Sequence, residues 1–168
     1  KADCEGLWAL LSAGAVDMVI TDHCDYTRAQ KLEVDDFTQT PGGLPGLETL
    51  LPLMATYGVA EGQIEWPDLA RLLAANPARI YGLWPRKGVL RPGADADVVL
   101  YDPEPESVLT DEAVHMRAGY TPFQGMRIQG KVMTTIRRGT FLVRDGRPVD
   151  PEDRGVFLKR SGGGSLPR

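Results

Sequence analysis

The stretch Val16-Asp17-Met18-Val19-Ile20-Thr21-Asp22-His23-Cys24 decides the fold class. Its first six residues are mostly apolar and β-branched, which is typical of a strand buried on both faces of a parallel sheet. A carboxylate directly after such a strand lies where barrels and open α/β sheets place catalytic groups. Asp is also a common turn residue, so Asp22 has two readings at this point.

The segments around this strand predict an α/β repeat. Helical periodicity indicates a helix just before it, with Gly14 at its carboxyl end. The chain from Asp22 to Gly46 is polar and rich in turn formers, and loops of that length inside compact domains are often functional. Two further helices follow, the second of which Asn76-Pro77 should break. The predicted helices are residues 3–13, 47–57 and 67–75.

Beyond Gly88 the pattern changes to closely spaced short strands, which predict a small β-sheet or sandwich. The expected strands are residues 96–101, 126–129, 132–137 and 140–144, with turns at Arg138-Gly139 and Asp145-Gly146. We therefore divide the chain into residues 1–85, with the strand and its helices, residues 86–150, which are rich in strands, and residues 151–168, a flexible tail.

Composition excludes several classes of partner. The 19 Lys and Arg residues against 23 Asp and Glu give a net charge of −4, without a basic stripe, so we expect no nucleic acid. The apolar stretches are far shorter than the roughly 20 residues of a membrane span. The amino end has no signal-peptide pattern and reads like the middle of a longer chain. Two cysteines are too few for a disulfide scaffold, which favours the cytoplasm.

Several separated motifs resemble, in order and spacing, the cyclic amidohydrolases, the family of hydantoinases, dihydropyrimidinases, allantoinases and dihydroorotases. The match extends to about residue 150. The resemblance implies an α/β fold, the carboxyl-terminal part of a (β/α)8 TIM barrel whose final strand is residues 16–21, followed by a sandwich-like subdomain. The motifs are Asp22-His23-Cys24, Lys31, Asp36-Phe37, Pro41 to Glu48, Asn76-Pro77-Ala78, Gly88, Pro92 to Asp97, Tyr120 to Phe123, and the strand pair from Gly130 to Gly146.

The resemblance also implies a metal-dependent chemistry. In that pattern two divalent metals, usually zinc, are bridged by a hydroxide that attacks the ring amide. Asp22 would ligate one metal and pass the hydroxide proton to the departing nitrogen. The family's four histidines and carboxylated lysine precede this region, and His23 and His115 are the only histidines here. We therefore expect the chain to be inactive by itself.

Further positions bear on the substrate. Gly42 and Gly43 match the place where the family's backbone contacts the substrate ring, although glycine there also suits a simple turn. Tyr26 stands where dihydroorotases have a histidine for the substrate carboxylate, and it offers no cation. A hydantoin or dihydropyrimidine is thus the expected small cyclic amide. The run from Gly46 to Leu53, written as in allantoinases and dihydroorotases, leaves the substrate open, and Asp25, usually Pro or a small residue, could alter ligand preference.

The remaining expectations are structural. His23 should point away from Asp22 and make structural hydrogen bonds, and Cys24 should be a buried thiol. Arg86 and Lys87 should face solvent.

We expect a homo-oligomer, a tetramer or a dimer, by resemblance. A non-catalytic scaffold homologue is the alternative, which the retained Asp22 disfavours. The predicted core consists of Trp8, Leu11, Leu69, Leu72 and Leu73.

Overall fold

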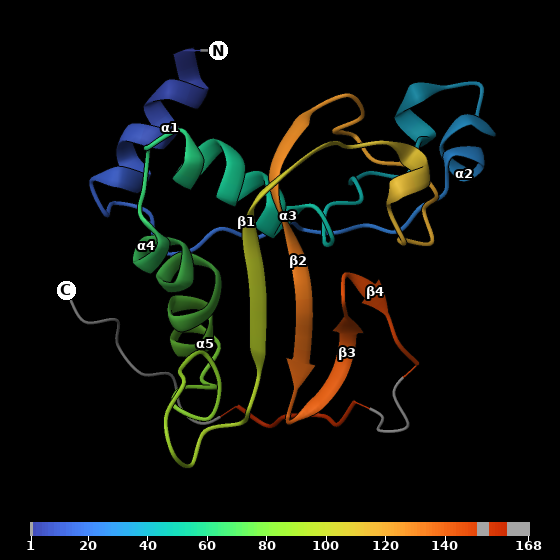
Figure 1. The fold of residues 1–168 in the computed structure, drawn as a ribbon. Coiled ribbons are helices and arrows are strands. Elements are labelled where there is room, and N and C mark those ends of the chain that lie inside the picture. Colours follow the sequence, from blue (N-terminus) through green and yellow to red (C-terminus); the bar gives the residue numbers. More distant parts are fainter. Residues whose placement is uncertain (1, 151–154, 161–168) are drawn as a thin grey trace.

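A computed structural model describes residues 2–150 and 155–160, as short helices packed against one antiparallel sheet (Figure 1). The predicted tail falls largely outside the described residues, and its described part, residues 155–160, has no helix or strand. No described helix has both the length and the apolar character needed to cross a membrane. The α-helices are α1 (Ala2–Ser12), α2 (Arg28–Leu32), α3 (Leu50–Leu53), α4 (Trp66–Ala70) and α5 (Asn76–Ile80). The 3₁₀ helices are η1 (Phe37–Gln39) and η4 (Asp111–Ala113), and the π-helical segments are η2 (Met54–Ala60) and η3 (Arg71–Ala75).

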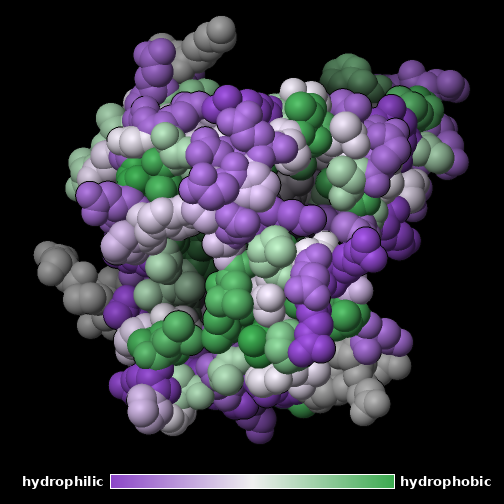
Figure 2. Space-filling model, viewed as in Figure 1, coloured by the Kyte–Doolittle hydropathy of each residue, from purple (hydrophilic) through white to green (hydrophobic). Residues whose placement is uncertain are grey.

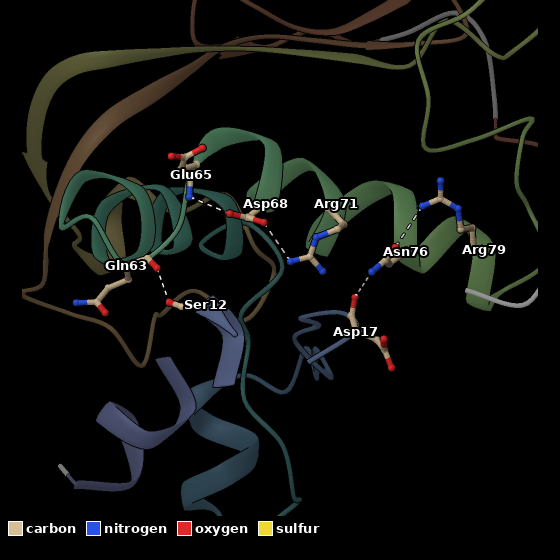
Figure 3. A network of polar contacts seen from close by, with 8 residues as sticks. All are labelled: Ser12, Asp17, Gln63, Glu65, Asp68, Arg71, Asn76 and Arg79. Atoms are coloured by element: carbon tan, nitrogen blue, oxygen red, sulfur yellow. Dashed lines mark hydrogen bonds and ion pairs between the residues drawn. The ribbon is translucent and has the colours of Figure 1, made fainter. Parts of the chain in front are cut away.

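The stretch predicted as the final barrel strand is extended, but it is not a strand, and its predicted burial on both faces is wrong. No described segment forms a strand ladder with it, and the Ile20 side chain is 56% exposed. One side is fixed to the helices: the Val19 amide donates to the Leu72 carbonyl oxygen at 3.3 Å, and Asn76 Nδ2 donates to the Asp17 carbonyl oxygen at 2.7 Å (Figure 3). A strand exists only when its backbone is paired along its length, so the barrel itself is not confirmed.

The predicted helices are present with shifted bounds. Helix α1 ends at Ser12, and Gly14 two residues later has φ of 71°, the left-handed cap that the sequence indicated. Helix α3 begins late, with Pro52 inside its first turn, where the missing amide hydrogen costs little. The expected break at Asn76-Pro77 is wrong: the wide turn η3 passes directly into α5, and Pro77 lies in the first turn of that helix.

The sheet has the order β1-β2-β3-β4, with every pair antiparallel. Its strands are β1 (Val98–Val108), β2 (Arg127–Arg137), β3 (Thr140–Arg144) and β4 (Arg147–Pro148). Both predicted turns are confirmed, because Arg138-Gly139 and Asp145-Gly146 have positive φ at each residue. The expected sandwich is a single sheet among the described strands.

Two strand predictions are wrong in their bounds. The two short strands expected between residues 126 and 137 are the single strand β2, which continues through Gly130. Gly130 has φ of 94°, and a Cβ there would lie 2.3 Å from the Tyr101 ring, so only glycine lets the strands pair at this point. Strand β1 also continues past Asp102-Pro103, its expected end.

The apolar core lies between the helices and β1. Its buried members are Leu11, Met54, Ala55, Ile64, Leu69 and Leu72, with Trp8, Leu73 and Tyr101 packed against them. The core predicted from helical spacing is therefore confirmed. Thr56 joins the helices to the sheet, because its hydroxyl accepts a hydrogen bond from the Gln129 amide at 2.9 Å.

The expectation that both Arg86 and Lys87 face solvent is wrong for Lys87, whose side chain is 17% exposed. The Lys87 ammonium contacts both Asp95, at 2.9 Å, and Asp97. Arg86 also contacts Asp95, at 3.1 Å, and is about half exposed. These charges fasten the segment before β1 to the end of the helices.

Candidate active site

Asp22 begins the candidate site, at the end of the extended stretch. Its backbone φ is 46°, in the left-handed region that L residues seldom occupy. The residue is exposed, and no hydrogen bond or ion pair engages its carboxylate within the described part of the chain. Uncommon backbone conformations cluster at functional sites when the surroundings hold them in place. The structure thus presents a carboxylate that is free to accept a proton or bind a cation.

His23, the residue after Asp22, connects the end of the extended stretch to residues 41–47, the glycine-rich loop. Its Nδ1 accepts hydrogen bonds from the backbone amides of Gly46, at 3.1 Å, and Leu47, at 3.2 Å. The lone pair on Nδ1 is therefore committed to the protein backbone. The predicted structural role of His23 is confirmed.

The two candidate substrate-binding glycines have different surroundings. Gly43 has φ of 89°, and a Cβ added there would lie 2.3 Å from Cys24 Sγ. The Cys24 amide also donates to the Leu44 carbonyl oxygen at 3.0 Å, so the loop returns to lie beside the residues that follow Asp22. Gly42 is exposed, with open space around the position of a Cβ. The structure brings Gly43 to the site, and contact of either glycine with a substrate stays a prediction.

Tyr26 lines a cavity of about 290 Å³ with Cys24, Asp25, Gln30 and Arg117. The ring of Tyr26 is 40% exposed, and Lys31 Nζ lies 5.8 Å from its centroid. That ammonium is held by the Pro41 carbonyl oxygen at 2.7 Å. The expectation that Cys24 is buried is wrong, because its thiol borders this cavity and is partly exposed.

Asp25 is engaged with protein groups, which disfavours the role in ligand preference considered for it. Its Oδ2 accepts a hydrogen bond from Arg117 Nε at 2.7 Å, and its Oδ1 accepts one from the Ala118 amide at 2.8 Å. The Arg117 hydrogen bond is the main cause that holds the pKa of Asp25 below its ordinary value of 3.8. Sequence reasoning missed Arg117, although the unusual acid at position 25 was a signal that it has a partner.

The described residues do not form a metal centre by themselves. They contain no group of three or more His, Cys, Asp or Glu side chains arranged to hold a metal ion. His115 is exposed, and its Nδ1 lies 2.7 Å from Glu48 Oε1. A metal-binding role for Asp22 stays a prediction.

Comparison with known proteins extends over most of the chain. The sequence model of the amidohydrolase family matches residues 1–142. D-phenylhydantoinase of Escherichia coli O1:K1 / APEC is 41% identical over 156 residues, which are 92% of this chain and 34% of the relative.

Solved structures of similar enzymes also match most of the chain. A D-hydantoinase from Bacillus sp. AR9 has a TM-score of 0.91 at 36% identity, covering 96% of this chain and 36% of its own. The dihydropyrimidinase from Brevibacillus agri has a TM-score of 0.91 at 33% identity, covering 95% of this chain and 35% of its own. The chain thus spans about a third of the length of the relatives that it matches.

Proposed function

This chain belongs to the amidohydrolase family, and from that premise we propose that it is the carboxyl-terminal part of a hydrolase that opens the ring of a hydantoin or dihydropyrimidine. The similar proteins named D-phenylhydantoinase, D-hydantoinase and dihydropyrimidinase support this substrate class. The observation that carries the proposal is the free carboxylate of Asp22 in a left-handed backbone conformation. Asp22 lies beside the glycine-rich loop, which bonds to His23 and approaches Cys24 closely at Gly43.

In the proposed reaction Asp22 has two roles, as a metal ligand and as the group that moves a proton. Two divalent metals, when bound, bring the pKa of water towards neutrality and polarise the amide carbonyl. The amide carbon gains the oxygen of a water molecule, the C–N bond breaks, and the nitrogen gains a proton. Asp22 can hold that proton and deliver it, because no described group occupies its oxygens. Gly42, Gly43 and Tyr26 would contact the ring.

The finer properties of the complete protein belong to the same proposal. Its barrel would place the other ligands around Asp22, and zinc would be the metal, since carboxylate oxygen is among the ligands zinc accepts. The protein would act in the cytoplasm, which agrees with the free thiols of Cys4 and Cys24. It would be a homo-oligomer, a tetramer or a dimer.

The Asp22→Asn substitution tests the proposed chemistry in the full-length protein. Asparagine keeps the size of the side chain but cannot take up a proton, so kcat for hydantoin should fall by about 10²- to 10⁴-fold. Steady-state kinetics and the metal content of the same samples measure the effect. Asp35→Asn is the matched control, because Asp35 is an exposed acid in the same loop, and it should leave kcat unchanged. Full activity in Asp22→Asn would contradict the proposal.

A substrate panel tests the substrate class. Hydantoin, dihydrouracil, allantoin and dihydroorotate are compared on the full-length protein, and metal content is measured in parallel. We expect hydantoin or dihydrouracil to be the best substrate. Rapid turnover of dihydroorotate would overturn the reading of Tyr26, whereas a metal-free protein that turns over none of the four would indicate a scaffold.

A further inference from the structure

The connection between β1 and β2, residues 109–126, lies beside the loop that follows Asp22. Figure 1 shows this connection, which contains η4, next to α2. Three pairs of oppositely charged or ionisable side chains join the connection to residues 25–48 at separate points. They are Asp25 with Arg117 at 2.7 Å, Arg28 with Asp111 at 2.7 Å, and Glu48 with His115 at 2.7 Å.

The pair nearest to Asp22 has the most complete set of contacts. Arg117 donates from Nε to the Asp25 carboxylate and from a terminal nitrogen to the Asp25 carbonyl oxygen, the latter at 3.2 Å. The carboxylate also accepts a hydrogen bond from the backbone amide of Ala118, a residue that is 4% exposed. A buried amide needs an acceptor, so Asp25 both pairs a charge and satisfies the backbone of the connection.

The connection is itself held in shape where it meets the loop. Asp111 Oδ2 accepts a hydrogen bond from the Arg28 guanidinium, and its Oδ1 accepts one from the Thr121 backbone amide at 2.9 Å. Glu48 accepts the His115 amide at 2.6 Å. Arg117 therefore projects from a braced segment, and it can fix the position of Asp25.

The backbone that carries Asp22 needs such support. Residues 15–27 belong to no helix and no strand, so no ladder of hydrogen bonds fixes them. Asp22 has a positive φ, and a residue in that region keeps its conformation only when its surroundings determine it. On one side this support comes from His23 and Cys24, which bond to the glycine-rich loop. On the other side it comes from Asp25.

We propose that Asp25 and Arg117 are a positioning pair that sets the direction of the Asp22 carboxylate, and this rests on the proposed function. In this role the pair acts on the backbone that carries Asp22, and not by binding substrate or metal. It acts through the two residues between Asp22 and Asp25, and it closes one side of the cavity that Cys24 and Tyr26 line. Catalytic groups displaced by about 1 Å can lose on the order of 10²-fold in rate, so a loosened pair should lower kcat more than it weakens substrate binding.

A double-mutant cycle in the full-length protein tests the pair. Asp25→Asn, Arg117→Gln and the double variant should each lower kcat for the best substrate by roughly 10- to 100-fold, with KM within about threefold and metal content unchanged. The double variant should be no slower than the slower single variant, because one contact is broken in every case. Arg117→Lys keeps the charge but loses the planar fork, and it should fall between Arg117→Gln and the unmodified protein.

The control is the ion pair of Glu106 and Arg127 on the sheet, whose arginine, like Arg117, is mostly exposed, with nitrogen and oxygen 3.8 Å apart. Glu106→Gln should change nothing. If Asp25→Asn lowers the melting temperature but not kcat per folded, metal-loaded molecule, the pair is merely structural and the proposal fails. Hydrogen exchange at the Cys24 and Ala118 amides gives a readout that needs no activity, and exchange should be faster in Asp25→Asn and Arg117→Gln than in Glu106→Gln.

This second readout separates the two proposals. If the unmodified protein hydrolyses none of the four rings, the proposed function fails, and the exchange rates alone decide whether the pair fixes the loop. If those rates are unchanged, the positioning role is refuted whatever the activity. If Asp25→Asn does not fold, Arg117→Lys and Arg117→Gln carry the same test.

Discussion

Gly43 illustrates how one missing side chain shapes the candidate site. A Cβ there would lie 2.3 Å from Cys24 Sγ, and its φ of 89° is unfavourable for any L side chain. Gly43→Ala should therefore destabilise the fold by roughly 1–3 kcal/mol, measured as the free energy of unfolding in urea. Gly42→Ala is the matched control, because Gly42 has open space and no positive φ, and its effect should stay within about 0.5 kcal/mol. Equal effects at both glycines would contradict this account.

At the scale of single residues, the sequence predicts contacts between residues that are close in the chain. The structural hydrogen bonds of His23 were predictable because they join it to a nearby loop of the same motif, whereas the roles of Asp22 and Gly43 stay predictions. Arg117 could not be predicted, since 92 residues separate it from Asp25 and no periodicity links them. The partial exposure of Cys24 was also missed, because the cavity that it borders includes the distant Arg117. The low exposure of the Lys87 side chain was missed although its partners Asp95 and Asp97 are only eight and ten residues away.

Thr56 couples the helical part of the chain to the sheet. The residue is 1% exposed, and its hydroxyl donates to the Pro52 carbonyl oxygen at 2.7 Å. The same hydroxyl accepts a hydrogen bond from the Gln129 backbone amide at 2.9 Å. Thr56→Val would leave the Gln129 amide without this acceptor, which costs about 1–3 kcal/mol. Thr56→Ser, the control, keeps the hydroxyl and should be more stable than Thr56→Val in urea unfolding. Equal stability of the two variants would show that the hydrogen bond contributes nothing.

Elements were predictable where their signals are local. The two glycine turns of the sheet and the cap at Gly14 depend on two or three residues, and all three are confirmed. Strand β1 was predicted too short because Pro103 usually ends a strand, yet proline is tolerated on an edge strand such as β1. Residues 16–21 have the composition of a buried strand, but pairing needs a neighbour that the composition does not supply.

At the scale of the whole molecule, apolar side chains remain on the surface. Figure 2 shows hydrophobic residues gathered near β1, bordered by hydrophilic ones. Val99 and Leu100 in β1 are 47% and 54% exposed. Strand β1 is also at one end of the strand order, so no described strand pairs with its outer edge. An exposed edge beside apolar surface favours association with another chain.

This surface predicts that the chain, produced by itself, associates with further copies. Sedimentation velocity at increasing concentration should show species larger than the 18.4 kDa monomer. Val99→Thr with Leu100→Thr keeps residues that suit a strand but removes apolar area, so the double variant should shift the distribution towards monomer. Leu90→Thr is the control, because Leu90 is 72% exposed and lies outside every helix and strand, and it should leave the distribution unchanged. A stable monomer of the unmodified chain at all concentrations would mean that the open edge of β1 is tolerated in water, and would refute the prediction.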